Sequence, residues 1–354
     1  MQAVGLKTYI WNNNFRSLLL LAGFPVLLIV LLWGVQLGLM GAGYLPHTGV
    51  MAEDEATSTR WLIESAPLAL IASGVWYCIA FFGYQSIIDL TTGAHKVTRA
   101  EAPELWNLLE NLCISRGLTM PDLRIAETES LNAWSSGLSD KRAVVTVTRG
   151  LLENLSRDEL EAVLAHELTH LINRDSRLMV IAAIFAGVIT LIAELFARVL
   201  FYGGGGRSRS SRDSGKGAGM LILVGLAIAA FGYVMAIVIR FAISRRREFM
   251  ADAGSVELTK NPDAMISALQ KISGHSGIHA PNDIQALFID NHEEGFAGLF
   301  DTHPPIDQRI AALVKYAHGH VEDAAVAPDA APVAVPVRPS DAESTSVPVS
   351  DSNS

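Results

Sequence analysis

The sequence predicts a multi-pass α-helical membrane protein that carries a mainly α (α+β) soluble domain. Of its 354 residues, 50% are hydrophobic, and the mean hydropathy is +0.31. The chain is therefore more apolar than an ordinary soluble protein. Charged residues make up 18% of it, however, which is too many for a chain lying wholly in lipid. Long uncharged runs alternate with periodic stretches of mixed composition, which indicates membrane spans joined to soluble segments.

Residues 1–90 are predicted to form an N-terminal membrane region with two transmembrane helices, at about 17–45 and 65–88. No Asp, Glu, Lys or Arg lies between Arg16 and Glu53, and the second run is also uncharged. Each run is long enough to cross a hydrocarbon core of about 30 Å. A cleaved signal peptide is the alternative for the first run, but the run exceeds the usual ~7–15 apolar residues, which favours a signal anchor.

Residues 91–177 are predicted to form the first part of the soluble domain. Apolar residues at helical spacing indicate a helix from Glu104 to Cys113. Two segments, 123–126 and the β-branched 143–148, have the composition of strands, and Ser135–Gly137 has that of a turn. Small α+β elements therefore precede the next helix.

Residues 178–243 are predicted to form a membrane hairpin of two apolar helices, at 178–202 and 217–239, which divides the soluble domain in sequence. If both helices are full spans, the Arg-rich loop between them faces away from the cytoplasm, against the positive-inside tendency. A re-entrant hairpin is the alternative. The second part of the soluble domain follows at 244–322. Residues 323–354 are rich in Ala, Pro and Ser without any period, and are predicted to be a disordered tail.

Charge and cysteine content restrict the location and the partners of the chain. Basic residues flank the spans at Lys7, Arg16, Lys96, Arg99 and Arg245–Arg247. They predict that the N-terminus and the soluble domain lie in the cytoplasm. The expected location is the cell inner membrane, in which the chain is multi-pass and has the lipid bilayer as a partner. A net charge of −9 without a basic patch excludes nucleic acid as a partner. Two cysteines are too few for a disulfide framework or a cysteine metal cluster.

A histidine pair within one predicted helix is the main functional motif. Ser156 and Glu159 form a capping-box pattern, and His166-Glu167-Leu168-Thr169-His170 lies in the helical run that follows. Four residues make a little over one turn, so both imidazoles face one side and can bind one Zn²⁺ at about 2.0–2.1 Å. Glu167 is the expected base that takes a proton from the attacking water. The cap, the helix and the spacing together disfavour the alternative of two ordinary histidines.

The two histidines leave a hydrolytic zinc site one protein ligand short. Metzincins have a further histidine six residues after the second, but that position is Ser176. A downstream carboxylate is the natural alternative, and Glu248 is the best candidate because it opens the helix that leaves the last apolar run. Asp252, one turn later on the same face, is expected to accept the free N–H of a ligating histidine. Taken alone, an ion pair with a neighbouring arginine explains Glu248 equally well.

Taken together, these segments resemble the HtpX heat-shock proteases, which are relatives of the CAAX-prenyl endopeptidases. The likeness covers roughly residues 10–315 and rests on the His-Glu-Leu-Thr-His helix and on Ser244–Ser255. Further matching segments are Leu131–Ala133, Val144–Thr148 and Thr302–Pro305 followed by Arg309. The resemblance implies a gluzincin-type zinc metallopeptidase domain with one Zn²⁺ per chain, Glu248 as the third ligand and Asp252 in support.

The resemblance also implies roles around a bound substrate. Asn132 would lie near the substrate backbone, and the strand Val144–Thr148 would be the sheet edge to which an extended peptide adds. Two roles stay open for His303, a hydrogen bond to the oxyanion or a structural contact before the next helix, and the structural role is slightly favoured.

The expected function is that of a zinc metalloendopeptidase that cleaves protein or peptide substrates, including misfolded or membrane proteins, in stress response and protein quality control. Two alternatives are a CAAX-prenyl-type processing protease and a non-proteolytic membrane scaffold that contains zinc. Structural zinc sites usually have four protein ligands, and only three are identified in the sequence, which favours an enzyme.

Overall fold

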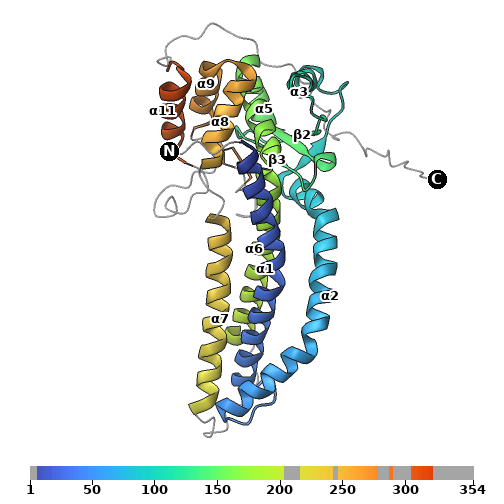
Figure 1. The fold of residues 1–354 in the computed structure, drawn as a ribbon, viewed down its shortest axis with the longest axis vertical. Helices are drawn as coiled ribbons and strands as arrows, with labels where there is room; N and C mark the ends of the chain where they lie inside the picture. The colour runs from blue at the N-terminus through green and yellow to red at the C-terminus, as the bar shows by residue number, and fades with distance from the viewer. Residues whose placement is uncertain are drawn as a thin grey trace, which may run out of the picture.

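The computed structural model describes residues 6–202, 216–241, 246–273, 275–277, 287–289 and 304–321. Figure 1 shows a long helical bundle with an α+β domain at one end. The predicted tail at 323–354 and His303 lie outside the described residues.

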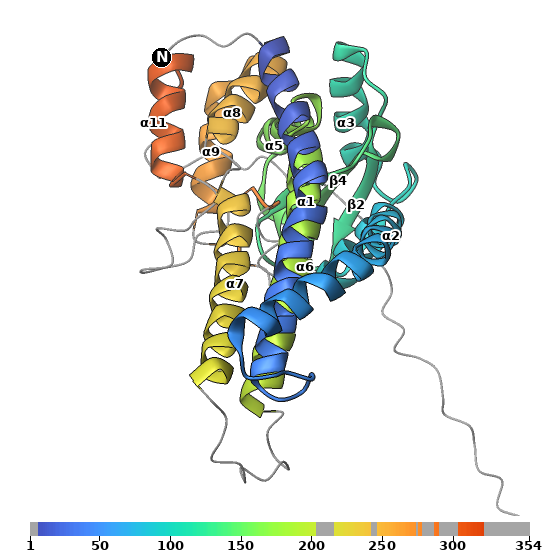
Figure 2. The ribbon, with the colours of Figure 1, turned by 60° about the horizontal axis from the view of Figure 1, so that its bottom comes forward.

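The long helices of the described residues form the bundle, and they are α1 (Leu6–Gly41), α2 (Met51–Thr92), α6 (Asp175–Tyr202) and α7 (Lys216–Phe241). α1 runs beside both α6 and α7 (Figures 1 and 2). The rings of Phe24 in α1 and Phe185 in α6 stack with their centroids 4.1 Å apart. A Cβ added to Gly225 of α7 would lie 2.7 Å from the carbonyl oxygen of Gly34 in α1. Small residues therefore let these two helices approach closely, as is common in membranes.

Among the described residues, two helical stretches are long and apolar enough to cross a membrane, Trp11–Gly41 and Asp175–Val199. The two parts of α2, Met51–Leu68 and Ser73–Thr92, make a third if they are counted as one span bent by 45°. The apolar stretch of α7 is shorter, Ile222–Val234. α1 begins before the predicted span and ends at Gly41, whereas α2 extends beyond the predicted span at both ends.

The soluble domain contains a four-stranded sheet. Its strands are β1 (Ala94–Lys96), β2 (Asp122–Ala126), β3 (Ala133–Ser136) and β4 (Val144–Thr148), in the spatial order β1-β2-β4-β3. β2 and β4 are parallel, with Leu123 opposite Val145, and the outer pairs are antiparallel. A short 3₁₀ helix, η1 (Asp140–Arg142), lies between β3 and β4.

Two sequence predictions about this sheet are wrong. The strand at 144–148 is not an edge, because β4 lies between β2 and β3. Ser135 and Ser136 belong to a strand rather than a turn, since they pair with Val145 and Val144 of β4. Their hydroxyl groups can be buried there because they bond to Ser176 at 2.8 Å and to the side chain of Gln85 at 2.7 Å. The turn begins only at Gly137, whose φ of 153° suits glycine.

Helices cover the sheet and form the core of the domain. They are α3 (Pro103–Arg116), α4 (Arg149–Asn154), α5 (Arg157–Ile172), α8 (Arg246–Thr259), α9 (Pro262–Ile272) and α11 (Ile306–Ala317). Leu109 of α3, Val145 of β4, Leu164 of α5 and Leu269 of α9 are fully buried in one apolar cluster. α5 therefore lies at the centre of the domain, in contact with the sheet and with α8 and α9.

The connection between α5 and α6 is very short. α5 ends at Ile172 and α6 begins at Asp175, so only Asn173 and Arg174 separate the two helices. Arg174 adopts the left-handed conformation, with φ of 64°, which lets the chain change direction within this turn. The central helix of the soluble domain thus leads directly into a helix of the bundle.

Candidate metal centre

The capping box at the start of α5 is confirmed. The amide of Ser156 donates to Glu159 Oε2 at 2.7 Å, and the amide of Glu159 donates to Ser156 Oγ at 3.4 Å. Glu159 also binds Lys271 Nζ of α9 at 2.8 Å. Burial by itself raises the pKa of Glu159, but its bonds to Lys271, Ser267 and Ser156 outweigh burial and lower it. The start of the helix is therefore fixed both by its own cap and by α9.

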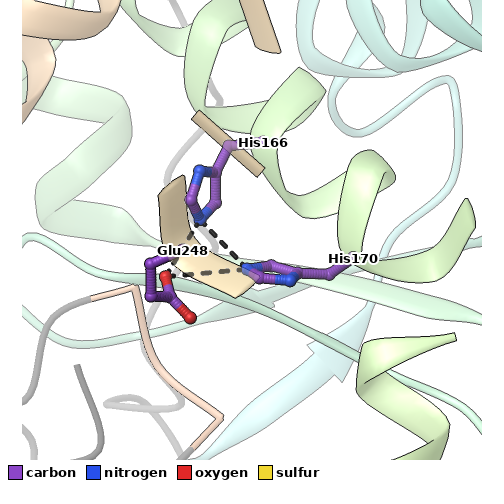
Figure 3. Close-up of side chains that lie close together, drawn as sticks. All are labelled: His166, His170 and Glu248. Atoms are coloured by element: carbon purple, nitrogen blue, oxygen red, sulfur yellow. Dashed lines mark hydrogen bonds and ion pairs between the residues drawn. The ribbon is translucent and has the colours of Figure 1, made fainter. Parts of the chain in front are cut away.

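The structure brings His166, His170 and Glu248 together (Figure 3). The Nε2 atoms of the two histidines lie 3.1 Å apart. Glu248 Oε2 lies 3.5 Å from His166 Nε2 and 3.7 Å from His170 Nε2. All three side chains are buried, with exposed fractions of 8% or less.

The spacing of these atoms fits a zinc ion. Bonds of about 2.0–2.2 Å in a tetrahedral site place neighbouring ligand atoms roughly 3.3–3.6 Å apart. The three observed separations lie close to that range. Burial alone lowers the pKa of His170, but the carboxylates of Glu248 and Asp175 raise it to about 10. The negative charges of these two carboxylates therefore favour a positive charge at this position.

Close packing of α8 against α5 places Glu248. A Cβ added to Gly254 of α8 would lie 2.4 Å from the side chain of Thr169 in α5, and Ser255 Oγ donates to the carbonyl of Ala162 at 2.6 Å. Arg247 Nε donates to Glu248 Oε1 at 3.0 Å, while Oε2 faces the histidines. The contact with arginine therefore engages Oε1 of this carboxylate, and the predicted role as a metal ligand falls to Oε2.

Asp252 binds the other nitrogen of His166. Its Oδ1 lies 2.9 Å from His166 Nδ1, the kind of contact that fixes the tautomer and orientation of a metal-binding ring. Arg309 of α11 contacts both oxygens of Asp252, at 2.9 and 2.6 Å. Burial raises the pKa of Asp252, but the charge of Arg309 and the contact with His166 together lower it below its ordinary value. Asp252 is thus held as a carboxylate beside the ring.

The role of Arg309 was not deduced from the sequence, although a signal for it exists. Arg309 is 1% exposed and lies on the face of α11 that also carries Ile306, Ile310 and Leu313. A charged residue at helical spacing among apolar ones indicates a buried partner of opposite charge.

A second carboxylate, Asp175, binds His170. Its Oδ2 lies 3.1 Å from His170 Nδ1, and its Oδ1 accepts a hydrogen bond from Asn13 Nδ2 of α1 at 2.8 Å. Sequence analysis identified neither residue. No local pattern connects Asn13 with Asp175, because they are 162 positions apart.

Glu167 follows His166 on α5 and is 1% exposed. Within the described residues, its buried Oε2 atom has no hydrogen-bond partner. Burying a carboxylate oxygen without a partner is costly, so such an atom suggests a functional group that acts on a ligand or water.

Asn132 is completely buried between the sheet and two short segments. Its side chain donates to the carbonyl of Ser276 at 2.8 Å and accepts from the amide of Ile289 at 3.0 Å. These contacts hold the chain together around the start of β3. A contact between Asn132 and substrate stays a prediction.

The comparisons with known proteins agree with the geometry. The family model described as Peptidase family M48 matches residues 99–317. A protease HtpX homolog of Bacteroides fragilis is 40% identical over 331 residues, which cover 89% of this chain and 100% of that protein. A protease HtpX homolog of Leuconostoc citreum is 35% identical over 319 residues, covering 88% and 99%.

Among solved structures, the crystal structure of S. mikatae Ste24p has a TM-score of 0.43 and 21% identity, over 69% of this chain and 57% of that one. A likeness of this size carries no part of the assignment. The family model and the HtpX homologs confirm both the resemblance stated from the motifs and the predicted fold class. The chain therefore belongs to peptidase family M48, as an HtpX-type membrane metalloprotease.

Proposed function

We propose that the chain is a zinc-dependent endopeptidase that cleaves misfolded or membrane proteins in protein quality control. The observation that carries the proposal is the buried triangle of His166, His170 and Glu248, together with a carboxylate oxygen of Glu167 in α5 that has no hydrogen-bond partner among the described residues. The names of the HtpX relatives support proteolysis. A structural zinc site usually has four protein ligands, whereas this cluster offers three among the described residues, which favours catalysis over a scaffold role.

In this proposal His166, His170 and Glu248 hold one zinc ion, and the remaining residues position groups or move protons. When bound, zinc acts as a Lewis acid that polarises the scissile carbonyl and lowers the pKa of water. Glu167 takes the proton from the attacking water and passes it to the leaving amine. Asp252 and Asp175 keep Nδ1 of each histidine engaged, so that each Nε2 faces Glu248.

We also propose that the protein lies in the cell inner membrane with its soluble domain in the cytoplasm. Lys7 and Arg16 belong to the first part of α1, which lies beside this domain in Figure 1, while Lys96 ends β1 and Arg99 follows it, in agreement with the positive-inside rule. α6 and α7 run side by side along the bundle (Figure 1), and α7 with its 26 residues is about 39 Å long. The whole helix is long enough for a full span, although its apolar stretch, Ile222–Val234, is shorter. A cysteine introduced at Ser210 should react with a reagent added from outside, and labelling only from the cytoplasm would support a re-entrant hairpin.

The test of the enzymatic proposal is Glu167→Gln in the full chain, purified in detergent with zinc. Cleavage of an unfolded substrate such as casein should fall on the order of 10²-fold or more because the base is lost, while zinc content measured by atomic spectroscopy should stay the same. Glu161→Gln is a matched control, since Glu161 lies on the same helix and is only partly buried. Unchanged cleavage by Glu167→Gln would refute the role of Glu167.

A further inference from the structure

Asn13 is a buried polar residue in the membrane helix α1. It lies in a run of three asparagines, Asn12 to Asn14, and is 2% exposed, whereas Asn14 is exposed and Asn12 is partly buried. One turn later, the buried hydroxyl of Ser17 donates to the carbonyl of Asn13 at 2.9 Å. The inward face of α1 is therefore polar near its N-terminus, at the level where α1 passes beside the soluble domain (Figure 1).

The side chain of Asn13 bonds to the turn between α5 and α6. Its Nδ2 donates to the carbonyl of Asn173 at 3.0 Å and to Asp175 Oδ1 at 2.8 Å. Both acceptors belong to buried residues. One amide therefore holds the backbone and the carboxylate of this turn at the same time.

The contact continues to the metal cluster. The second oxygen of the same carboxylate, Asp175 Oδ2, lies 3.1 Å from His170 Nδ1. With Oδ1 fixed by Asn13, rotation of the carboxylate is restricted, and Oδ2 keeps its place beside the ring. An N–H at Nδ1 that donates to Asp175 leaves the lone pair of Nε2 directed to the position between His166 and Glu248.

We propose that Asn13 is a positioning residue of the metal centre, which acts from the membrane helix α1 through Asp175 on the ring of His170. The inference rests on the proposed zinc site. Mutation of a residue that orients a metal ligand typically lowers metal affinity by about 10–100-fold. Asn13 is one contact further from the ligand than Asp175, so the lower end of that range is expected.

The test compares Asn13→Ala with Asn14→Ala in the full chain in detergent. The zinc dissociation constant, measured by competition with a chromogenic chelator, should rise about tenfold in Asn13→Ala and stay unchanged in Asn14→Ala. In the cobalt-substituted protein at saturating metal, Asn13→Ala should also shift the visible absorption bands, which report the geometry of the ligands. This second measurement distinguishes a reoriented ring from a general loss of stability.

A double-mutant cycle tests the route through Asp175. If Asn13 acts through this carboxylate, Asn13→Ala should cause no further loss of zinc affinity in an Asp175→Ala background. Independent, multiplying losses would overturn the proposal, and so would equal zinc affinity and identical cobalt spectra for Asn13→Ala and the unaltered protein. Failure of the unaltered protein to bind zinc would instead overturn the proposed function, and this inference with it.

Discussion

His166 and His170 occupy successive turns of α5, yet different regions of the molecule support them. Asp252 contacts Nδ1 of His166, and the guanidinium of Arg309 holds Asp252 with two contacts inside the soluble domain. Behind His170 stands Asp175, which the neutral amide of Asn13 holds from a membrane helix. The half of the site around His166 is thus supported by a charged guanidinium of the soluble domain. The half around His170 is supported by a neutral, dipolar amide of the helical bundle.

The difference indicates how each half should respond to change. A buried carboxylate paired with a cation is strongly destabilised when the cation is removed, because an uncompensated charge stays behind. A carboxylate bonded to an amide loses only one hydrogen bond, which is worth less. The half supported by the soluble domain should therefore show the larger losses, in stability and in zinc affinity, whereas changes in the half supported by the membrane helix should alter metal geometry with little loss of stability.

The largest effect is expected from Arg309→Met. It leaves the charge of Asp252 buried without its cation, at a cost of about 3–5 kcal/mol, so the unfolding temperature in detergent should fall sharply. Arg116→Met is the control, because Arg116 forms an exposed ion pair with Glu257 that is worth less than about 1 kcal/mol. Equal melting temperatures for the two variants would contradict the importance of the buried pair.

A smaller and more specific effect is expected from Asp252→Asn and Asp175→Asn, compared side by side. Each should weaken zinc binding by about 10–100-fold in a chelator competition. The loss should be greater for Asp252→Asn, since the charge of Arg309 then lies buried beside His166 without the carboxylate of Asp252. A greater loss for Asp175→Asn would reverse the proposed comparison of the two halves.

The smallest effect is expected at the start of α5, remote from both halves. The pKa of Glu159 is lowered in the folded protein from its ordinary value of 4.5. The charged side chain therefore contributes its full stabilisation at pH values above 4.5. That contribution is lost as the pH falls through the lower folded pKa. Thermal melting at pH 7 should therefore show a deficit for Glu159→Gln that shrinks as the pH is lowered below 4.5. A deficit that is constant with pH would mean that the charge of Glu159 is unimportant.

How much of the fold and of the site could be predicted depends on how far apart the interacting residues lie in the sequence. The cap at Ser156 and the pairing of His166 with His170 follow from helical periodicity, because the partners are at most four residues apart. Glu248 lies beyond α6 and α7, so spacing alone left it with two interpretations, and only the resemblance implied that it is a metal ligand. Asn13 and Asp175 meet only through the packing of α1 on α6, which no local pattern encodes.

The sheet shows the same dependence. β4 was recognisable from its β-branched residues, but its place within the sheet depends on β3, a short strand containing two serines. The hydroxyls of Ser135 and Ser136 are satisfied by α6 and α2, so these polar residues are stable in a buried strand only because the helices are there. Strand composition could therefore identify an element without giving its neighbours.

The two-residue connection between α5 and α6 has a consequence for reach. Five positions separate His170 from Asp175, where the stretch of α6 that is long and apolar enough to cross a membrane begins, and this is under about 10 Å of chain along a helix. With so short a connection, the fold fixes the position of the metal cluster relative to this apolar stretch. A substrate anchored in the same bilayer would be cut at a set distance from the point where its chain leaves the membrane. The connection between α5 and α6, and not the side chains of the substrate, would determine this distance.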